Sequence, residues 1–237
     1  EDALYVSNYD QGRLSGASGS YLSRLAADGR ILDQKWVSGL AAPTGMIIHD
    51  DRLYVVERPG VAVIDTGKGE IIERIRISSP GFLNDIARDP SGRLYISDSS
   101  RGIIWRIENG SAEKWFEDRH LTAPNGLLVH GEELLIGSSK DHSLKAVHLE
   151  KNTIRTLARF ESGVMDGIKA GLGGSILISH WEGRLFQITP EGEITKLLDT
   201  SAPGHKIADF EFLPESGRLF IPTMDTGVIK SFVLKYR

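Results

Sequence analysis

Short apolar runs recur along the chain at nearly constant intervals. Their first residues are Leu4, Leu53, Leu94, Leu134, Ile176 and Leu219, so the steps between them are 49, 41, 40, 42 and 43 residues. Each run is bounded by polar residues and by glycine, as buried β-strands commonly are. The spacing therefore predicts a β unit that repeats six times.

Each unit contains further strand signals around its apolar run. A second apolar segment precedes every run except the first, and it is entered through Thr44-Gly45, Asn84-Asp85, Asn125-Gly126, Asp166-Gly167 or Ala208-Asp209. Two alternating segments follow the run and are joined by a tight turn, for which Asn109-Gly110 is an example. Four short strands in about 40 residues are typical of a propeller blade. No sustained helical periodicity occurs, so we predict an all-β chain in which residues 1–237 form one six-bladed β-propeller domain with four-stranded antiparallel blades.

The first and last units are incomplete. The first lacks its entry strand, and the sixth stops after the segment Ser231 to Leu234 without a fourth strand. Propellers often close by letting the N-terminal segment complete the last blade, so we expect about 20 further residues before Glu1 in the natural protein.

Composition narrows the range of partners. The chain has 28 Lys and Arg against 32 Asp and Glu, a net charge of −4, and its basic residues are scattered, which argues against nucleic acid binding. The longest uncharged stretch, Trp36 to His49, has 14 residues and is too short for a membrane span, which needs roughly 20. Zero cysteines exclude disulfides and thiol chemistry. The oligomeric state is left open.

Candidate site residues follow from the propeller geometry. The first strand of a blade lines the channel, so the entry residues are expected to converge on one axis: Thr44, Asn84, Asn125, Asp166 and Asp209. Loops after the second strands should add residues to the same face: Asn8, Asp10, Glu57, Arg58, Asp98, Lys140, His180, Trp181 and Asp225. His205 falls in another loop predicted on this face.

The chemistry of the entry residues indicates a hard cation. Amide and carboxylate oxygens are the ligands that calcium prefers, and it takes 6 to 8 of them. The alternative is that Asn-Gly and Asp-Gly are only good turn formers at a strand start. Recurrence at one position in successive units favours the cation. The sequence contains no His-Glu-x-x-His motif, nucleophile elbow, phosphate-binding loop or dinucleotide fingerprint.

Three strings, one unit apart and in this order, resemble the senescence-marker-protein/gluconolactonase/luciferin-regenerating-enzyme family: Phe82-Leu83-Asn84-Asp85, Pro124-Asn125-Gly126-Leu127 and Met165-Asp166-Gly167-Ile168. The resemblance implies a divalent metal, usually calcium or zinc, at the channel of a six-bladed propeller. By resemblance Asn125 and Asp166 would be metal ligands, and Asn84 a ligand or a substrate contact. The family's first-blade Glu ligand has no counterpart in this sequence.

The stretch Ile207 to Glu215 resembles a bacterial, exported branch of the same family. This resemblance implies a periplasmic or secreted protein, whereas the residues by themselves leave the cytoplasm open as well.

The sequence leaves two functions open. The first is a metal-dependent hydrolase of a small-molecule lactone or ester, with Asp166 or His180 accepting a proton from the attacking water. Substrate contacts would then come from Thr44, Glu57, Arg58, Asp98, Lys140, Trp181, His205 and Asp209. The second is a non-catalytic propeller that binds a ligand or protein and holds at most a structural calcium.

Overall fold

The structure is a computed structural model that describes residues 3–9, 19–202, 204–224 and 226–234. It consists of antiparallel β-sheets with one short 3-10 helix among the described residues. The chain forms two compact units, Glu1–Trp115 and Phe116–Arg237. Within the described part of the chain, no helix has the length and hydropathy that crossing a bilayer requires.

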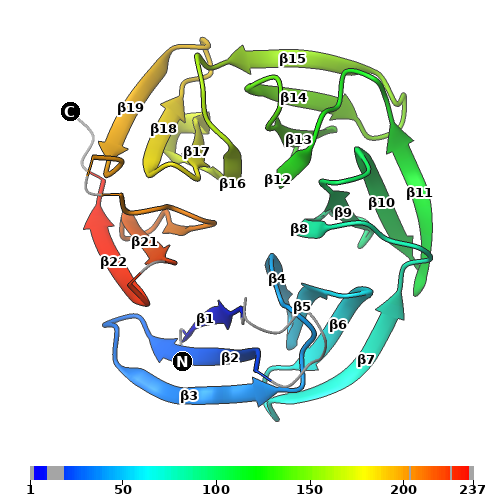
Figure 1. The fold of residues 1–237 in the computed structure, drawn as a ribbon, viewed down its shortest axis with the longest axis vertical. Coiled ribbons are helices and arrows are strands. Elements are labelled where there is room, and N and C mark those ends of the chain that lie inside the picture. Colours follow the sequence, from blue (N-terminus) through cyan, green and yellow to red (C-terminus); the bar gives the residue numbers. More distant parts are fainter. Residues whose placement is uncertain (1–2, 10–18, 203, 225, 235–237) are drawn as a thin grey trace. The chain divides into compact units, whose positions relative to one another are not determined.

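The first unit contains three sheets, which we call blades 1 to 3 (Figure 1). Blade 1 has three strands, β1 (Ala3–Asn8), β2 (Tyr21–Ala26) and β3 (Ile31–Ser38). Blade 2 has four, β4 (Met46–His49), β5 (Arg52–Glu57), β6 (Gly60–Asp65) and β7 (Glu70–Arg76). Blade 3 consists of β8 (Leu83–Arg88), β9 (Leu94–Asp98), β10 (Ile103–Glu108) and β11 (Ser111–Glu117), whose last two residues belong to the second unit.

The second unit contains blades 4 to 6 (Figure 1). Blade 4 comprises β12 (Pro124–His130), β13 (Glu133–Ser138), β14 (Ser143–His148) and β15 (Ile154–Arg159). Blade 5 comprises β16 (Met165–Ala170), β17 (Ile176–His180), β18 (Arg184–Ile188) and β19 (Ile194–Asp199), with the 3-10 helix η1 (Leu172–Gly174) between its first two strands. Blade 6 comprises β20 (Glu211–Leu213), β21 (Arg218–Thr223) and β22 (Val228–Val233).

The strands of every blade follow one another in chain order as an antiparallel meander, which confirms the predicted fold class, a six-bladed β-propeller. The six apolar runs of the sequence form the strands β1, β5, β9, β13, β17 and β21. Among the described residues the first and last blades have three strands each, as expected. The hairpin turn at Asn109-Gly110 has positive φ at both residues, 50° and 75°, as two-residue hairpins require.

The apolar runs are continuous because each second strand contributes to two cores. In β17, Ile176 and Ile178 pack into a cluster shared by blades 4 and 5, whereas Leu177 packs into a cluster shared by blades 5 and 6. In β5, Leu53 and Val55 likewise face blade 1, and Val56 faces blade 3. Since successive side chains of a strand point to opposite faces, a strand buried on both faces must be apolar at every position.

The first strands of neighbouring blades approach so closely that only glycine fits between them. A Cβ atom on Gly126 would lie 1.7 Å from the carbonyl oxygen of Asp166, and one on Gly167 would lie 2.1 Å from Oδ1 of Asp209. In the first unit, a Cβ on Gly45 would lie 2.3 Å from Oδ1 of Asp85. None of the three glycines has positive φ, so lack of space, and not backbone conformation, accounts for them.

We predict that Gly126→Ala lowers the free energy of unfolding by about 2–3 kcal/mol, because the added methyl group forces β12 and β16 apart. Urea unfolding of the variant measures this loss. Gly67→Ala is the matched control, since its nearest neighbour would be 3.4 Å from the new Cβ and its φ is not positive. Equal stabilities of the two variants would contradict the close approach.

Candidate functional site

Three of the five entry dipeptides lie at irregularities inside strands and not at turns. The register of β12 against β13 shifts between Pro124 and Leu127, which places Asn125-Gly126 in a β-bulge. The same shift occurs at Asp166-Gly167 in β16 and at Asn84-Asp85 in β8. The alternative interpretation of these pairs as turn formers is therefore wrong. A bulge re-aims a side chain, and such irregularities are common beside functional sites.

Each bulge leaves an additional backbone N–H that the sheet does not pair, and two blades supply a serine for it. The N–H of Gly167 donates to Oγ of Ser179 at 2.9 Å, and the N–H of Asp85 donates to Oγ of Ser97 at 3.0 Å. Both serines are fully buried. The bulges are thus stabilised from within their own blades, which fixes the residues that they carry.

Asn125 contains an unsatisfied polar atom in the interior. The residue is 7% exposed, and its Oδ1 has no hydrogen-bond partner among the described residues. Leaving a buried acceptor unpaired costs about 1–3 kcal/mol, so natural structures rarely tolerate one without a function. An amide oxygen in this state is suited to coordinate a cation.

Asp166 lies on the strand next to Asn125. Gly126 packs directly against its backbone carbonyl, as described above, and the side chain is half-buried. Beyond it, Lys169 pairs with Asp209 at 3.3 Å between Nζ and Oδ2. The amide of Asn125 in β12, the carboxylate of Asp166 and the ammonium group of Lys169 in β16, and the carboxylate of Asp209 just before β20 thus follow one another from blade 4 to blade 6.

Lys169 was not among the residues predicted from the sequence, and neither was Glu211, whose charge interacts with those of Lys169 and Asp209. Burial raises the pKa of Glu211 above its usual range, and the charge of Lys169 opposes the shift. Glu211 is exposed at the start of β20. The signal that could have identified it is its position two residues after Asp209.

The donor set fits a hard divalent cation. Asn125 and Asp166 both offer oxygen atoms, which suits calcium better than a metal that prefers imidazole or thiolate. No cluster of three or more His, Cys, Asp or Glu side chains with metal-binding geometry occurs in the described ranges. Asn84, the third ligand candidate, lies in β8 of the first unit, where its Nδ2 donates to Oγ of Ser99 at 3.3 Å.

Other predicted contact residues lie at varied places. Thr44 precedes β4 and its Oγ1 donates to the carbonyl of Leu83 at 3.4 Å. Arg58 stacks over Phe82, and Trp181 lies beneath Lys206. The others are Lys140, which is exposed, His205, which is half-buried, and Asn8, whose Nδ2 donates to Ser23. Asp10 and Asp225 lie outside the described residues.

Comparison with protein families identifies one match, to the SMP-30/gluconolactonase/LRE-like region, over residues 17–225. The chain belongs to this family. Comparison with curated protein sequences gives no match.

Solved structures that are similar to this family member share its fold and differ in function. A gluconolactonase from Xanthomonas campestris is 18% identical with a TM-score of 0.71, covering 86% of this chain and 75% of its own. The calcium-binding protein regucalcin from Agrobacterium tumefaciens is 21% identical with a TM-score of 0.68, covering 85% and 74%. An inactive virginiamycin B lyase from Staphylococcus aureus, solved with quinupristin, is 14% identical with a TM-score of 0.68, covering 90% and 73%.

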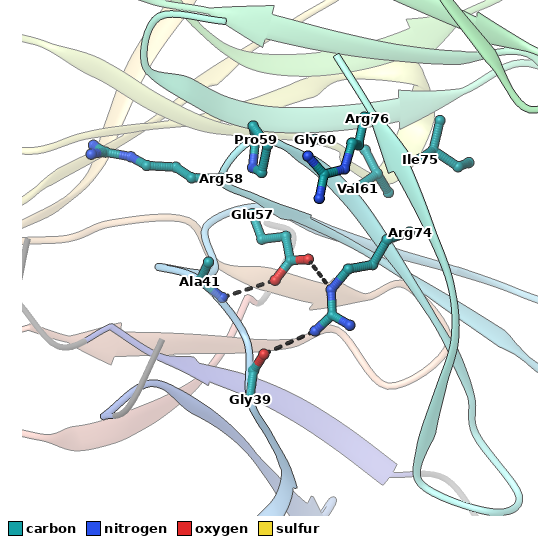
Figure 2. A pocket seen from close by; sticks show the side chains of 10 residues that line it. All are labelled: Gly39, Ala41, Glu57, Arg58, Pro59, Gly60, Val61, Arg74, Ile75 and Arg76. Atoms are coloured by element: carbon teal, nitrogen blue, oxygen red, sulfur yellow. Dashed lines mark hydrogen bonds and ion pairs between the residues drawn. The ribbon is translucent and has the colours of Figure 1, made fainter. Parts of the chain in front are cut away.

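In this family member the last residue of a second strand holds the linker that enters its blade. Oε2 of Glu57 accepts the N–H of Ala41 at 2.8 Å (Figure 2), and Oδ2 of Asp98 accepts the N–H of Gly81 at 2.8 Å. Ser138 accepts the N–H of Thr122 in the same way, at 3.1 Å. The prediction that Glu57 and Asp98 lie in loops is wrong, since they end β5 and β9. Asp98 is 0% exposed, so it supports the linker and does not offer a surface to a substrate.

His180 occupies the same position in blade 5 and uses different chemistry. It was predicted in a loop but is the last residue of β17 and 0% exposed. Its ring packs against Phe160 and Phe186 with centroid distances of 4.7 and 4.6 Å. A Cβ on Gly163 would lie 2.3 Å from its Nδ1, so the linker packs directly on the ring. Neither ring nitrogen has a hydrogen-bond partner among the described residues.

This enclosure determines the protonation of His180. Burial lowers its pKa to about 4; Glu182 opposes the shift, while Arg184 and His142 add to it. His180 is therefore a neutral ring at pH 7, enclosed by aromatic side chains.

We predict that His180 makes the fold sensitive to acid. In the unfolded chain it binds a proton below pH 6.5, but in the folded chain only below about 4. The unfolded state binds more protons between these values, so the contribution is fully present above pH 6.5 and is lost as the pH falls towards 4, by about 3 kcal/mol in total. Unfolding of the wild type and of His180→Leu from pH 7.5 to 4 measures the difference. A pH dependence that is the same in both would contradict the prediction.

Proposed function

We propose that this chain is a divalent-metal-dependent hydrolase of a small-molecule lactone or ester. The observation that carries the proposal is the buried, unpaired Oδ1 of Asn125, one residue before a glycine that packs on Asp166. Membership of the SMP-30/gluconolactonase/LRE-like family supports the reaction class, and so does the shared fold of a gluconolactonase.

Asn125 and Asp166 would hold the metal. Calcium is favoured because the donors are oxygen atoms. The likeness to a structure described as a calcium-binding protein supports this choice. When bound, the metal would polarise the carbonyl group and stabilise the oxyanion that develops on it.

The protein's own groups supply proton transfer and charge. Asp166 accepts a proton from the attacking water, since it is half-buried and lies beside the metal ligand Asn125. The ion pair between Lys169 and Asp209 fixes an ammonium group on the strand that carries Asp166. Glu211, whose pKa is raised, stays protonated to a higher pH than an ordinary glutamate. His180 takes no part, because its ring is enclosed away from water.

We predict that lactone or aryl-ester hydrolysis is abolished by chelation and restored by calcium. Asp166→Asn and Asn125→Ala should each reduce kcat/KM by about 100-fold or more, the usual contribution of a positioned base or charge-stabilising group. Initial rates over a panel of lactones and aryl esters measure this. Asp51→Asn is the control, since this aspartate is exposed in the turn between β4 and β5. Turnover that is unaffected by chelation and by Asp166→Asn would refute the metal mechanism.

A second candidate is a ligand-binding propeller with a structural calcium. It is favoured by Thr44, which stands in blade 2 where blades 3 to 5 carry Asn or Asp, and whose hydroxyl donates to the carbonyl of Leu83. Calcium would then raise the melting temperature by mass action, and no member of the substrate panel would be turned over.

A further inference from the structure

A row of four side chains crosses blades 5 and 6 at the end where β16 begins. Val164 is the last residue before β16, and Trp181 is the first residue after β17. Lys206 lies in the linker that leads to β20, and Met224 is the first residue after β21. In an antiparallel meander these four positions come to the same end of the blades. We call this row the entry strip.

Val164 and Trp181 are cross-strand neighbours in this strip. Met165 pairs with His180, and one residue further out the N–H of Trp181 donates to the carbonyl of Val164 at 2.8 Å. Met165 and His180 are both 0% exposed, so alternation along the strands turns Val164 and Trp181 to the other face. That face is turned towards blade 6, since Leu177, four residues before Trp181, packs into the core shared with blade 6.

The strip continues into blade 6. The ammonium group of Lys206 lies 5.2 Å from the ring centroid of Trp181, a cation–π contact that holds the indole in place. Ile207 and Thr223 form an antiparallel bridge, and both are buried. Their neighbours Lys206 and Met224 therefore stand opposite each other on the exposed face of the bridge. The four side chains thus form one continuous row.

The loop that carries Trp181 is fixed against the linker that carries Lys206. The N–H of Thr200 donates to the carbonyl of Gly183 at 2.7 Å, and its hydroxyl lies 3.0 Å from the carbonyl oxygens of both Gly183 and His205. A Cβ atom on Gly183 would lie 2.3 Å from the carbonyl oxygen of His205, so the two segments are in direct contact. The strip is therefore already formed before a ligand arrives, which lowers the cost of binding.

The strip exposes apolar side chains in loops, whereas elsewhere such side chains lie in strands. Ten large apolar side chains are exposed in the described part of the chain, and eight of them belong to strands. The other two are Val164 and Met224, which are 39% and 40% exposed and stand on either side of the pair formed by Trp181 and Lys206. Single exposed apolar residues are common, but a contiguous group beside functional residues is typical of a ligand surface.

The strip adjoins the site proposed for hydrolysis. Asp166 follows Val164 by two residues. Ser179, whose Oγ accepts the N–H of Gly167 in the bulge, also donates to the carbonyl of Ala208 in the linker at 2.8 Å. The bulge that carries Asp166 and the linker that carries part of the strip are thus joined by one buried hydroxyl group. A substrate whose carbonyl group lies at Asp166 would place a substituent on the strip.

We infer that the substrate is a lactone or ester with an apolar alkyl or aryl substituent, which lies on Val164, Trp181 and Met224. The inference rests on the proposed hydrolase function and specifies its substrate class. A lactone substituted only with hydroxyl groups would leave the three side chains without apolar cover, whereas an alkyl chain removes them from water. Each methylene group that is covered in the transition state raises kcat/KM by up to about fourfold.

Hydrolysis rates of two lactones measure this preference. δ-Decalactone differs from δ-valerolactone by a pentyl chain, and its kcat/KM should be at least about tenfold higher. The ratio of the two kcat/KM values should fall by about fivefold or more in Trp181→Ala, and also fall in Met224→Ser, because less apolar surface is covered. A general loss of activity cancels in this ratio, so a variant that is only destabilised does not imitate the result.

Ile194→Ser is the matched control for these variants. It removes an apolar side chain that is 41% exposed in blade 5 but belongs to β19 and not to the strip, and it should keep the wild-type ratio. A kcat/KM that is no higher for δ-decalactone, or a ratio that Trp181→Ala leaves unchanged, would overturn the inference.

A binding measurement without turnover separates this inference from the proposed hydrolase. The chain has four tryptophans, so Trp181→Phe identifies the indole N–H resonance of Trp181 in nitrogen–proton correlation spectra. Pentylcyclopentanone, a ketone that cannot be hydrolysed, should shift this resonance in the wild type and in Asp166→Asn, whereas cyclopentanone should not.

The outcomes of this titration are distinct. Absence of lactone hydrolysis together with the shift would refute the hydrolase alone and leave the strip as a surface that binds an alkyl group. Absence of the shift, or an equal shift with cyclopentanone, would overturn the inference. A Trp181 resonance that moves on dilution of the protein would instead assign the strip to contact between two copies, and would overturn it as well.

Discussion

Close approach between the first strands of neighbouring blades is the constraint on which the remaining structure depends. Gly126 and Gly167 each stand where a Cβ atom would overlap the next strand, at the carbonyl of Asp166 and the carboxylate of Asp209. Strands that approach so closely cannot carry large side chains between them, so their polar residues are brought next to each other from positions about 40 residues apart in the repeat. The same proximity allows Asn125 to lie against the strand of Asp166.

The bulges convert this proximity into a candidate site. A regular strand would alternate its side chains between the two cores on either side, and Asn125 or Asp166 would then enter an apolar cluster. An extra residue in the strand releases the side chain from that alternation, at the expense of one unpaired N–H. In blades 3 and 5 a buried serine accepts that N–H, as Ser97 and Ser179 show. What remains unpaired is the amide oxygen of Asn125, and a cation is the ligand that would satisfy it.

The ends of the second strands show how one structural task is met by different chemistry, with different consequences. Glu57, Asp98, Ser138 and His180 all lie where a linker enters their blade. In blade 2, the buried Glu57 also orients Arg74. In blade 5, the linker packs on the neutral ring of His180, and the fold becomes sensitive to its protonation. The last residue of the second strand thus supports the linker in each of these blades, and its chemistry differs from blade to blade.

The sequence by itself determined the repeat, the all-β class, the boundaries of the apolar strands and the family, because strand periodicity and turn glycines act over a few residues. It also singled out Asn125 and Asp166, whose recurrence follows the repeat. Only the tertiary structure decided that these pairs are bulges, that Glu57, Asp98 and His180 end strands in the interior, and that the charges of Lys169 and Glu211 interact with that of Asp209. Those outcomes depend on which strand lies beside which and how closely, and contacts between residues distant in the chain leave no periodic signal in the sequence.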